Sequence, residues 1–261
     1  QGFELQLRAD VFRDRNWTVA LWGNMAHNTN EILKISDSQK KYNERVAAFY
    51  QKEIDKQLTT NSSLSDANYS VPIPQYAEGQ SLTSIWAVRS LGIDPTTGKE
   101  IFLNRDGSEE VAVGNTEPKF NGSFGLNVTY KNWSLFASFL YEWGGQEYNQ
   151  TLVDNVENAN IKTGNVDLRV LTDRWKKPGD IAQFKDIKDS NLTTLPTSRF
   201  VQDKALLHLN SLTISYDFDR EWIKKHLRMN MLRLEANTSE LINWNSIRQE
   251  RGLSYPRSWK M

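Results

Sequence analysis

The stretch from Phe120 to Trp143 constrains the fold more than any other part of the chain. From residue 120 to residue 130 apolar and polar side chains alternate strictly. After Lys131 and Asn132 a second alternation begins, and it continues to Trp143. Successive side chains of a β-strand point to opposite faces, so this pattern predicts two strands that each have one apolar face. The short polar link between them is typical of a hairpin.

The length of these strands suggests a membrane. Each is about 11 residues long, which is the length of a tilted strand that crosses a bilayer. Aromatic residues lie at the ends of the apolar face, as in the belts at two membrane interfaces. The residues expected in such belts are Phe120, Tyr130, Trp133, Tyr141, Trp143, Tyr216 and Phe218. A long hairpin in the core of a soluble β-sandwich would show the same alternation, so the rest of the chain has to decide.

Other segments repeat the alternation. The segments with strand periodicity are 3–11, 17–26, 82–90, 100–104, 212–218 and 232–237. They pair into three further hairpins, one of them around the turn cluster at 92–98. Short connections alternate with long ones, which is the asymmetry of outer-membrane barrels. The pattern therefore predicts an all-β fold, a transmembrane antiparallel β-barrel with long extracellular loops.

The polar faces of these strands are charged. The charged residues on them include Glu4, Arg8, Asp10, Arg233 and Glu235. In a barrel these side chains would line a water-filled lumen, whereas in a sandwich they would face solvent. The competing interpretation is therefore a soluble β-sandwich module for carbohydrate binding or adhesion. A small passive porin is a third interpretation.

The connections include one helix. Apolar residues recur at helical spacing from Tyr42 to Leu58, after a capping box at Ser36–Gln39, and predict a helix over Asp37–Leu58. The remaining connections are polar and interrupted by Gly and Pro, and we expect them to be loops. They cover residues 59–79, 106–117, 144–204 and 245–257.

Composition removes several classes of function. The chain has 261 residues, with 32 basic and 32 acidic side chains, so no net field favours nucleic acid as a partner. It has no cysteine, and its three histidines, His27, His208 and His226, lack the spacing of metal ligands. No nucleophile elbow or phosphate loop is present. We therefore predict no enzyme, no catalytic residue, no metal and no cofactor, although a converging pair of glycosidase carboxylates stays open.

Several segments resemble the C-terminal part of the SusC/RagA-type TonB-dependent outer-membrane transporters. Their order and spacing across almost the whole chain make the resemblance specific. The segments are Gly2–Leu5, Asn28–Ser36, Leu91–Gly98, Pro118–Gly125, Gly144–Asn149, Asp173–Trp175 with Pro178–Asp180, and Ser198–Val201. The resemblance implies a 22-stranded barrel with a plug inside it and a SusD-like surface lipoprotein as a lid.

The resemblance sets the remaining expectations. Residues 1–261 would form the C-terminal arc of the barrel, and the plug, the TonB-contacting segment, the first strands and the last strand would lie outside this chain. The function implied is TonB-dependent import of glycan or peptide oligomers across the outer membrane of a Gram-negative, Bacteroidota-like cell. Its partners would be the lid, TonB through the plug, and membrane lipid. Loop aromatics that could stack on substrate are Trp143, Tyr148 and Trp175, although packing within the loops would also explain them.

Overall fold

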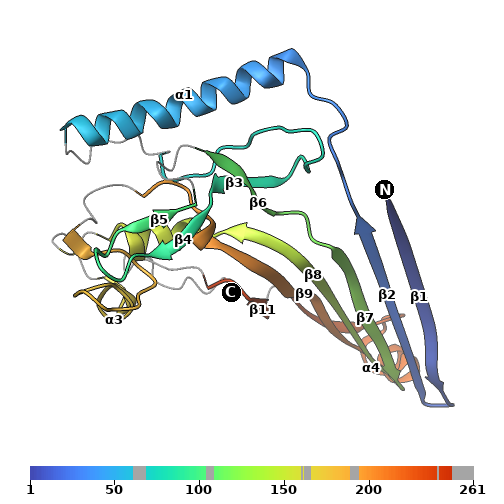
Figure 1. Cartoon of the computed structure of the whole chain (residues 1–261). Coiled ribbons are helices and arrows are strands. Elements are labelled where there is room, and N and C mark those ends of the chain that lie inside the picture. The colour runs from blue at the N-terminus through green and yellow to red at the C-terminus, as the bar shows by residue number, and fades with distance from the viewer. Residues whose placement is uncertain are drawn as a thin grey trace. The chain divides into compact units, whose positions relative to one another are not determined.

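The computed structural model describes residues 1–60, 69–103, 109–159, 161, 166–188, 194–239 and 241–248 (Figure 1). The chain divides into two compact units. The first, here called the sheet unit, comprises Gln1–Thr29, Pro118–Gly145 and Lys204–Ser246. The second, here called the insert unit, comprises Asn30–Glu117, Gln146–Asp203 and Ile247–Met261.

The sheet unit is built on one antiparallel sheet of seven strands, in the order β1-β2-β7-β8-β9-β10, with β11 also paired to β9. The strands are β1 (Gly2–Arg13), β2 (Trp17–Asn28), β7 (Phe120–Tyr130), β8 (Trp133–Tyr148), β9 (Val201–Asp217), β10 (Arg233–Thr238) and β11 (Asn243–Asn245). Figure 1 shows the long strands side by side. The hairpins predicted over 3–26, 120–143 and 212–237 are confirmed.

The register of the sheet aligns the apolar faces of its strands. Residues paired across antiparallel strands project to the same face. Leu5 is paired with Met25, and Leu126 is paired with both Leu21 and Ala137. A slip of one residue in any pair would have placed apolar side chains on both faces. The alternation in the sequence therefore becomes one continuous apolar surface.

One β-bulge corrects the predicted face of β1. The register shifts between Asp10 and Phe12, so Phe12 and not Val11 is paired with Val19 on the apolar face. A bulge adds one residue to one strand and reverses the parity beyond it. The alternation predicted over 3–11 places Val11 on the same face as Phe3 and Leu5, because simple alternation gives no sign of an inserted residue.

Three glycines of the sheet lie opposite aromatic residues. In each case the glycine and the ring are directly paired across neighbouring strands, as Gly23 with Phe124, Gly122 with Tyr141, and Gly125 with Trp22. The aromatic ring itself covers Gly125, where an added Cβ would lie 2.6 Å from the ring of Trp22 and 2.5 Å from the carbonyl oxygen of Ala137. Such pairs fill the gap that a glycine leaves in a sheet.

The insert unit begins with the predicted helix, α1 (Asp37–Thr60). The capping box is confirmed: the Ser36 amide donates to Gln39 Oε1 at 2.8 Å, and the Gln39 amide donates to Ser36 Oγ at 3.3 Å. The apolar stripe packs Val46 and Tyr50 against Tyr69 in a small core. The side chain of Leu58, which the same stripe included, lies outside the described residues.

Two small sheets in the insert unit overturn part of the prediction. β3 (Ser84–Val88) pairs with β6 (Glu110–Asn115), and β4 (Ser90–Ile93) pairs with β5 (Glu100–Phe102). The segment 82–104 was predicted as a hairpin of the barrel wall, but it forms no part of the seven-stranded sheet. Residues 106–117 were predicted as loop but include β6. The burial of β3 shows why this segment does not belong to a membrane wall. Four consecutive side chains, from Ile85 to Val88, are buried, as in a strand that is covered on both faces.

The stretch 144–204 is also more ordered than the loop that was predicted. β8 continues to Tyr148 and β9 begins at Val201. Between them lie α2 (Gln150–Leu152), a π-helical turn at Val153–Glu157, α3 (Arg169–Thr172) and a 3₁₀ turn at Ser198–Phe200. They enclose a hydrophobic core that includes Val153, Val156, Val170, Phe184 and Phe200. The insert unit therefore has its own packed interior.

The last connection of the sheet contains a short helix. α4 (Arg220–Leu227) joins β9 to β10 and begins at Asp219, whose side chain accepts from the Trp222 amide at 2.9 Å. In the loop predicted at 245–257, Asn245 ends β11, and residues 249–261 lie outside the described part of the chain. None of the helices in the described residues is long and apolar enough to cross a membrane.

Candidate membrane surface

The polar face of the sheet carries the predicted charges. Glu4 is paired with Ala26, and Arg8 with Trp22, on the face opposite to the leucines of β1. Arg233 is paired with Asp217 and donates to both of its carboxylate oxygens, at 2.6 and 2.8 Å. The register therefore places these charges together on one face, as predicted. Such a face needs contact with water.

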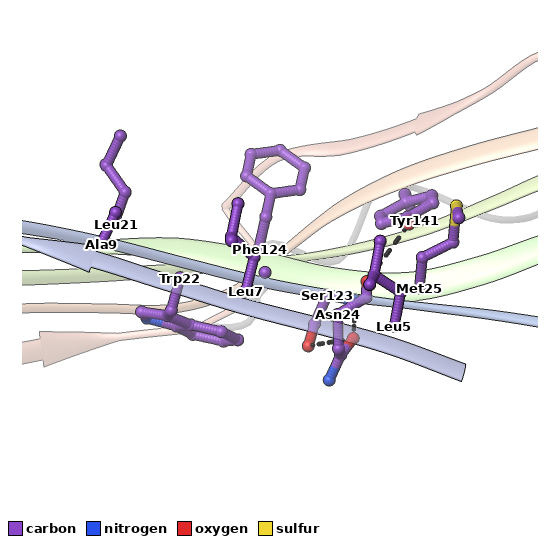
Figure 2. Close-up of a pocket in the computed structure, with 11 residues that line it drawn as sticks. Leu5, Leu7, Ala9, Leu21, Trp22, Asn24, Met25, Ser123, Phe124 and Tyr141 are labelled. Carbon is purple, nitrogen blue, oxygen red and sulfur yellow. Dashed lines mark hydrogen bonds between the residues drawn. The ribbon is translucent and has the colours of Figure 1, made fainter.

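The apolar face of the sheet is exposed along its length. Leu5 is 58% exposed, Leu7 69% and Phe124 43%. Figure 2 shows these side chains on one side of the ribbon with Leu21 and Met25, whereas Trp22, Asn24 and Ser123 lie on the other side. Soluble monomers rarely expose a contiguous apolar surface of this kind, which marks an interface with another protein or with a membrane.

An aromatic row borders this face where the short turns lie. The ring centroids of Trp17 and Tyr130 are 4.2 Å apart, and those of Trp133 and Tyr216 are 4.8 Å apart. Phe218 continues the row at 5.0 Å from Tyr216. The hydrogen bond from the Lys131 amide to the Asn16 carbonyl oxygen, 2.9 Å long, ties two of the turns together beneath this row.

A second row borders the opposite end. Phe3 lies 5.5 Å from His27, His27 lies 5.3 Å from Phe120, and Phe120 lies 6.4 Å from Trp143, all between ring centroids. His27 was considered in the sequence only as a metal ligand, and its place in the row was missed. Its parity with Met25 on the apolar face of β2 was the available signal.

The distance between the rows fits a bilayer. Phe120 and Tyr130 lie at opposite ends of β7, so the rows are ten residue steps apart. At a rise of about 3.3 Å per residue, and for a strand tilted by about 40–45°, this separation would span ~25 Å along a membrane normal, the height of the apolar band of a transmembrane barrel.

Tyr141 lies inside the second row. It is paired with Gly122, its ring centroid is 6.2 Å from that of Phe124, and its hydroxyl donates to the Asn24 carbonyl oxygen at 3.2 Å. It lines a shallow apolar groove of about 450 Å³, together with Leu5, Leu7 and Met25 (Figure 2). Its place in an interface belt remains a prediction, as it does for the other six residues.

In the insert unit, a buried arginine from the segment Ser198–Val201 binds two carboxylates. Arg199 donates to both carboxylate oxygens of Glu100, at 2.8 and 2.9 Å, and to Glu157 Oε1 at 2.7 Å. Glu157 is fully buried. Burial lowers the pKa of Arg199, but the hydrogen bonds and charges of Glu100 and Glu157 outweigh burial and raise it above the ordinary value. Sequence reasoning identified Arg199 only within a motif and missed both glutamates, which are far away in the chain.

A second buried arginine, Arg174, binds the backbone beside Glu157. Arg174 is buried and donates to the carbonyl oxygens of Lys185 and Glu157, both at 2.9 Å, and also to that of Val156. Burial lowers its pKa, while the charge of Glu157 opposes that shift. Both arginines therefore bind Glu157, Arg174 through its carbonyl oxygen and Arg199 through its carboxylate.

The three loop aromatics predicted to meet substrate occupy different environments. Trp143 is 65% exposed at the end of its strand pair. Trp175 is only 8% exposed: its Nε1 donates to the Pro95 carbonyl oxygen at 2.8 Å, and its ring fills the space above Gly98. Tyr148 is half-buried against Phe200, and burial raises the pKa of its hydroxyl. Substrate contact stays a prediction for all three.

Comparisons with known proteins agree with the resemblance read from the motifs. No family model matches the chain. The chain is 21% identical over 234 residues to "TonB-dependent receptor P3" of Formosa agariphila, a match that covers 86% of this chain and 22% of that protein. This relative is named as a receptor.

Solved structures share the fold. A chain in "Structure of the RagAB peptide transporter" aligns with a TM-score of 0.64 and 18% identity, over 94% of this chain and 26% of that chain. A chain of the RagAB peptide importer in the "open-open" state aligns with a TM-score of 0.66 and 18% identity, over 93% of this chain and 25% of that one. The chain thus spans between 22% and 26% of the length of these relatives. In sequence and in fold, the chain is similar to a segment of a SusC/RagA-type TonB-dependent transporter.

Proposed function

We propose that this chain forms part of the wall and the extracellular loops of a TonB-dependent transporter that imports nutrient oligomers across a bacterial outer membrane. The observation that carries the proposal is the apolar face of the sheet, which is in register across its strands and bordered by two aromatic rows. Lipid would cover this face. The opposite, charged face would line a lumen filled by water and by a plug.

The edge of the sheet favours a larger barrel. Among the described strands, β1 pairs only with β2, so one side of a strand of 12 residues presents unpaired N–H and C=O groups. Each such group left unsatisfied in lipid costs on the order of several kcal/mol. A further strand must therefore pair with β1 in the membrane. The 22-stranded barrel implied by the family would supply it and leave no edge.

The proposed mechanism is active import. TonB in an energised complex would pull on the plug and open the lumen, while a SusD-like surface lipoprotein would hold substrate above the barrel. In this arrangement the insert unit, whose segments join the ends of β2 and β8 to later strands, would provide the extracellular surface that meets the lid. Its packed core and buried charge network suit a surface that must keep its shape.

Peptide is the substrate that the comparisons favour. The solved structures similar in fold are a peptide transporter and a peptide importer, and this is the support for proposing peptide oligomers here. Glycan oligomers remain the second candidate, because the sequence relative is named only as a receptor. The soluble-sandwich interpretation requires a second layer over the apolar face. Within the described sheet unit that face remains exposed, as the values for Leu5 and Leu7 show.

The proposal is tested by isolating the full-length parent protein from native outer membranes. A tagged copy would be extracted in detergent, and proteins present in equal amount would be identified by mass spectrometry. We expect a surface lipoprotein to accompany the parent protein. We also expect cells that lack the parent protein to lose peptide uptake. A parent protein found in the soluble fraction, without detergent, would overturn the proposal.

A further inference from the structure

The connection between β9 and β10 has a positively charged surface. Its exposed cations are Arg220, Lys224, Lys225 and Arg228, against the two carboxylates of Asp219 and Glu221. Asp219 is engaged as the cap of α4. Within the part of the chain that the structure describes, no carboxylate lies within ion-pair distance of the last three cations. This surface is therefore available to an anion.

Exposed apolar side chains lie beside these cations. Trp222 is 48% exposed, Leu227 46%, Met229 47% and Met231 72%. Ile223, in contrast, is fully buried and fixes the helix to its own unit. A short helix that combines cations with exposed Trp, Leu and Met has the composition of an element that lies in a membrane interface.

The helix also continues an aromatic row of the sheet. The ring of Trp222 stacks on Phe218 with centroids 6.2 Å apart, and His226 stacks on Trp222 at 5.1 Å. Phe218 in turn contacts Tyr216, whose partner across the sheet is Leu234 on the apolar face. The cations are thus placed next to the boundary of the apolar surface, on the side of the short turns.

We propose that α4 and the residues up to Met231 bind the headgroups of anionic phospholipids such as phosphatidylglycerol. The inference rests on the proposed function, in which the apolar face contacts lipid and the connections after β2 and β8 are extracellular. The short turns, at the other ends of these strands, would then face the periplasm. Lysine and arginine would donate to the phosphate, while Trp222 and Met231 would enter the upper acyl region. A soluble acidic partner would match the charges but not the neighbouring apolar side chains.

The test measures lipid bound to the full-length parent protein. The purified protein would be titrated in detergent with phosphatidylglycerol, phosphatidylcholine or lipid A, and bound lipids would be counted by native mass spectrometry. The variant combines Lys224→Gln, Lys225→Gln and Arg228→Gln. A matched control makes the same change of charge on α1, with Lys41→Gln, Arg45→Gln and Lys52→Gln.

We expect the parent protein to bind phosphatidylglycerol in preference to phosphatidylcholine. The α4 variant should lose at least about tenfold in apparent affinity, because each basic side chain near the surface contributes to binding, and the α1 control should lose nothing. Equal binding by the α4 variant, or a preference for lipid A, would overturn the inference and leave the proposed function intact. A parent protein that is soluble without detergent and binds no lipid would overturn both.

Discussion

The ring of Trp22 occupies the space that a side chain at Gly125 would need. The two residues are directly paired between β2 and β7, and a Cβ at Gly125 would meet both the ring, at 2.6 Å, and the backbone oxygen of Ala137, at 2.5 Å. Because the second obstacle is backbone, a change of rotamer at Trp22 would not relieve the clash. This glycine fixes how closely three strands approach one another.

We therefore expect Gly125→Ala to destabilise the sheet by about 1–3 kcal/mol, the range for overpacking a well-packed site. Gly23→Ala is the matched control, since its Cβ would lie 3.6 Å from the nearest atoms, in ordinary contact. The readout is the temperature at which the band of the folded full-length protein shifts to the position of the unfolded protein in a detergent gel. Equal transition temperatures for the two variants would show that the close contact at Gly125 does not exist in the protein.

A second prediction separates the two faces of β7. Leu126 lies midway between the aromatic rows on the apolar face, and Asn127 follows on the polar face. Arginine at the midplane of a lipid-facing surface costs about 2–4 kcal/mol, whereas a lumen tolerates it. Leu126→Arg should reduce the amount of folded protein in the outer membrane, and Asn127→Arg should change it little. The opposite order would reverse our assignment of the faces.

The buried arginine gives a prediction for the insert unit. In Arg199→Met, the fully buried carboxylate of Glu157 would lose the cation that binds it, and breaking a buried ion pair in this way costs about 3–5 kcal/mol. Hydrogen exchange should rise across 153–157 and 173–187, while the strands of the sheet unit keep their protection.

The double variant Arg199→Met with Glu157→Gln tests the cause. It removes the charge of Glu157 and leaves only that of Glu100 without its cation, so it should recover part of the lost protection. No recovery at all would mean that Arg199 stabilises the insert unit through packing against Phe200, over whose ring it lies at 4.6 Å, and not through charge.

The stability of the insert unit should also depend on pH through Glu110. Burial raises the pKa of its carboxyl to about 8, although a hydrogen bond from Gln75 opposes the shift. The folded protein then holds a proton that the unfolded chain releases near its ordinary pKa, about 4.5. The contribution of Glu110 to the free energy of unfolding is therefore fully present below the ordinary pKa. It is lost as the pH rises toward the folded-state pKa of about 8.

Glu110→Gln should remove this dependence, because an amide resembles the protonated carboxyl at every pH. Thermal unfolding of the insert unit at pH 5 and pH 8.5 would measure it. We expect the variant to be more stable than the parent at the higher pH and similar at the lower one. Parallel pH dependence in both proteins would show that Glu110 is ionised in the folded state.

Features of the fold that depend on residues close in sequence were predicted, and features that depend on distant residues were not. The hairpin at 120–143 and the capping box at Ser36 belong to the first group, because neighbouring residues determine both patterns. The bulge near Val11 was not, since an inserted residue leaves alternation intact on both sides. The hairpin predicted at 82–104 was placed in the wrong sheet, because alternation over a few residues identifies a strand but not the strands with which it pairs.

The candidate sites show the same limit. Alternation predicted the two faces of the sheet, and the register confirmed that they are continuous. The ion pairs of Arg199 could not be predicted, since their partners are 99 and 42 residues away and no periodicity connects them. The buried place of Trp175 was equally hidden, because it depends on a turn 80 residues earlier in the chain.

The most direct test of the central claim compares the environments of Leu126 and Asn127. The chain has no cysteine, so a spin label can be attached at Leu126→Cys or Asn127→Cys without removing other thiols, provided that the rest of the parent protein is cysteine-free or made so. In bilayers, collisions with oxygen report lipid and collisions with a polar nickel complex report water. We predict that the label at 126 collides mainly with oxygen and the label at 127 mainly with nickel. Equal access of the nickel complex to both labels would contradict the account, because it would place the apolar face of the sheet in water.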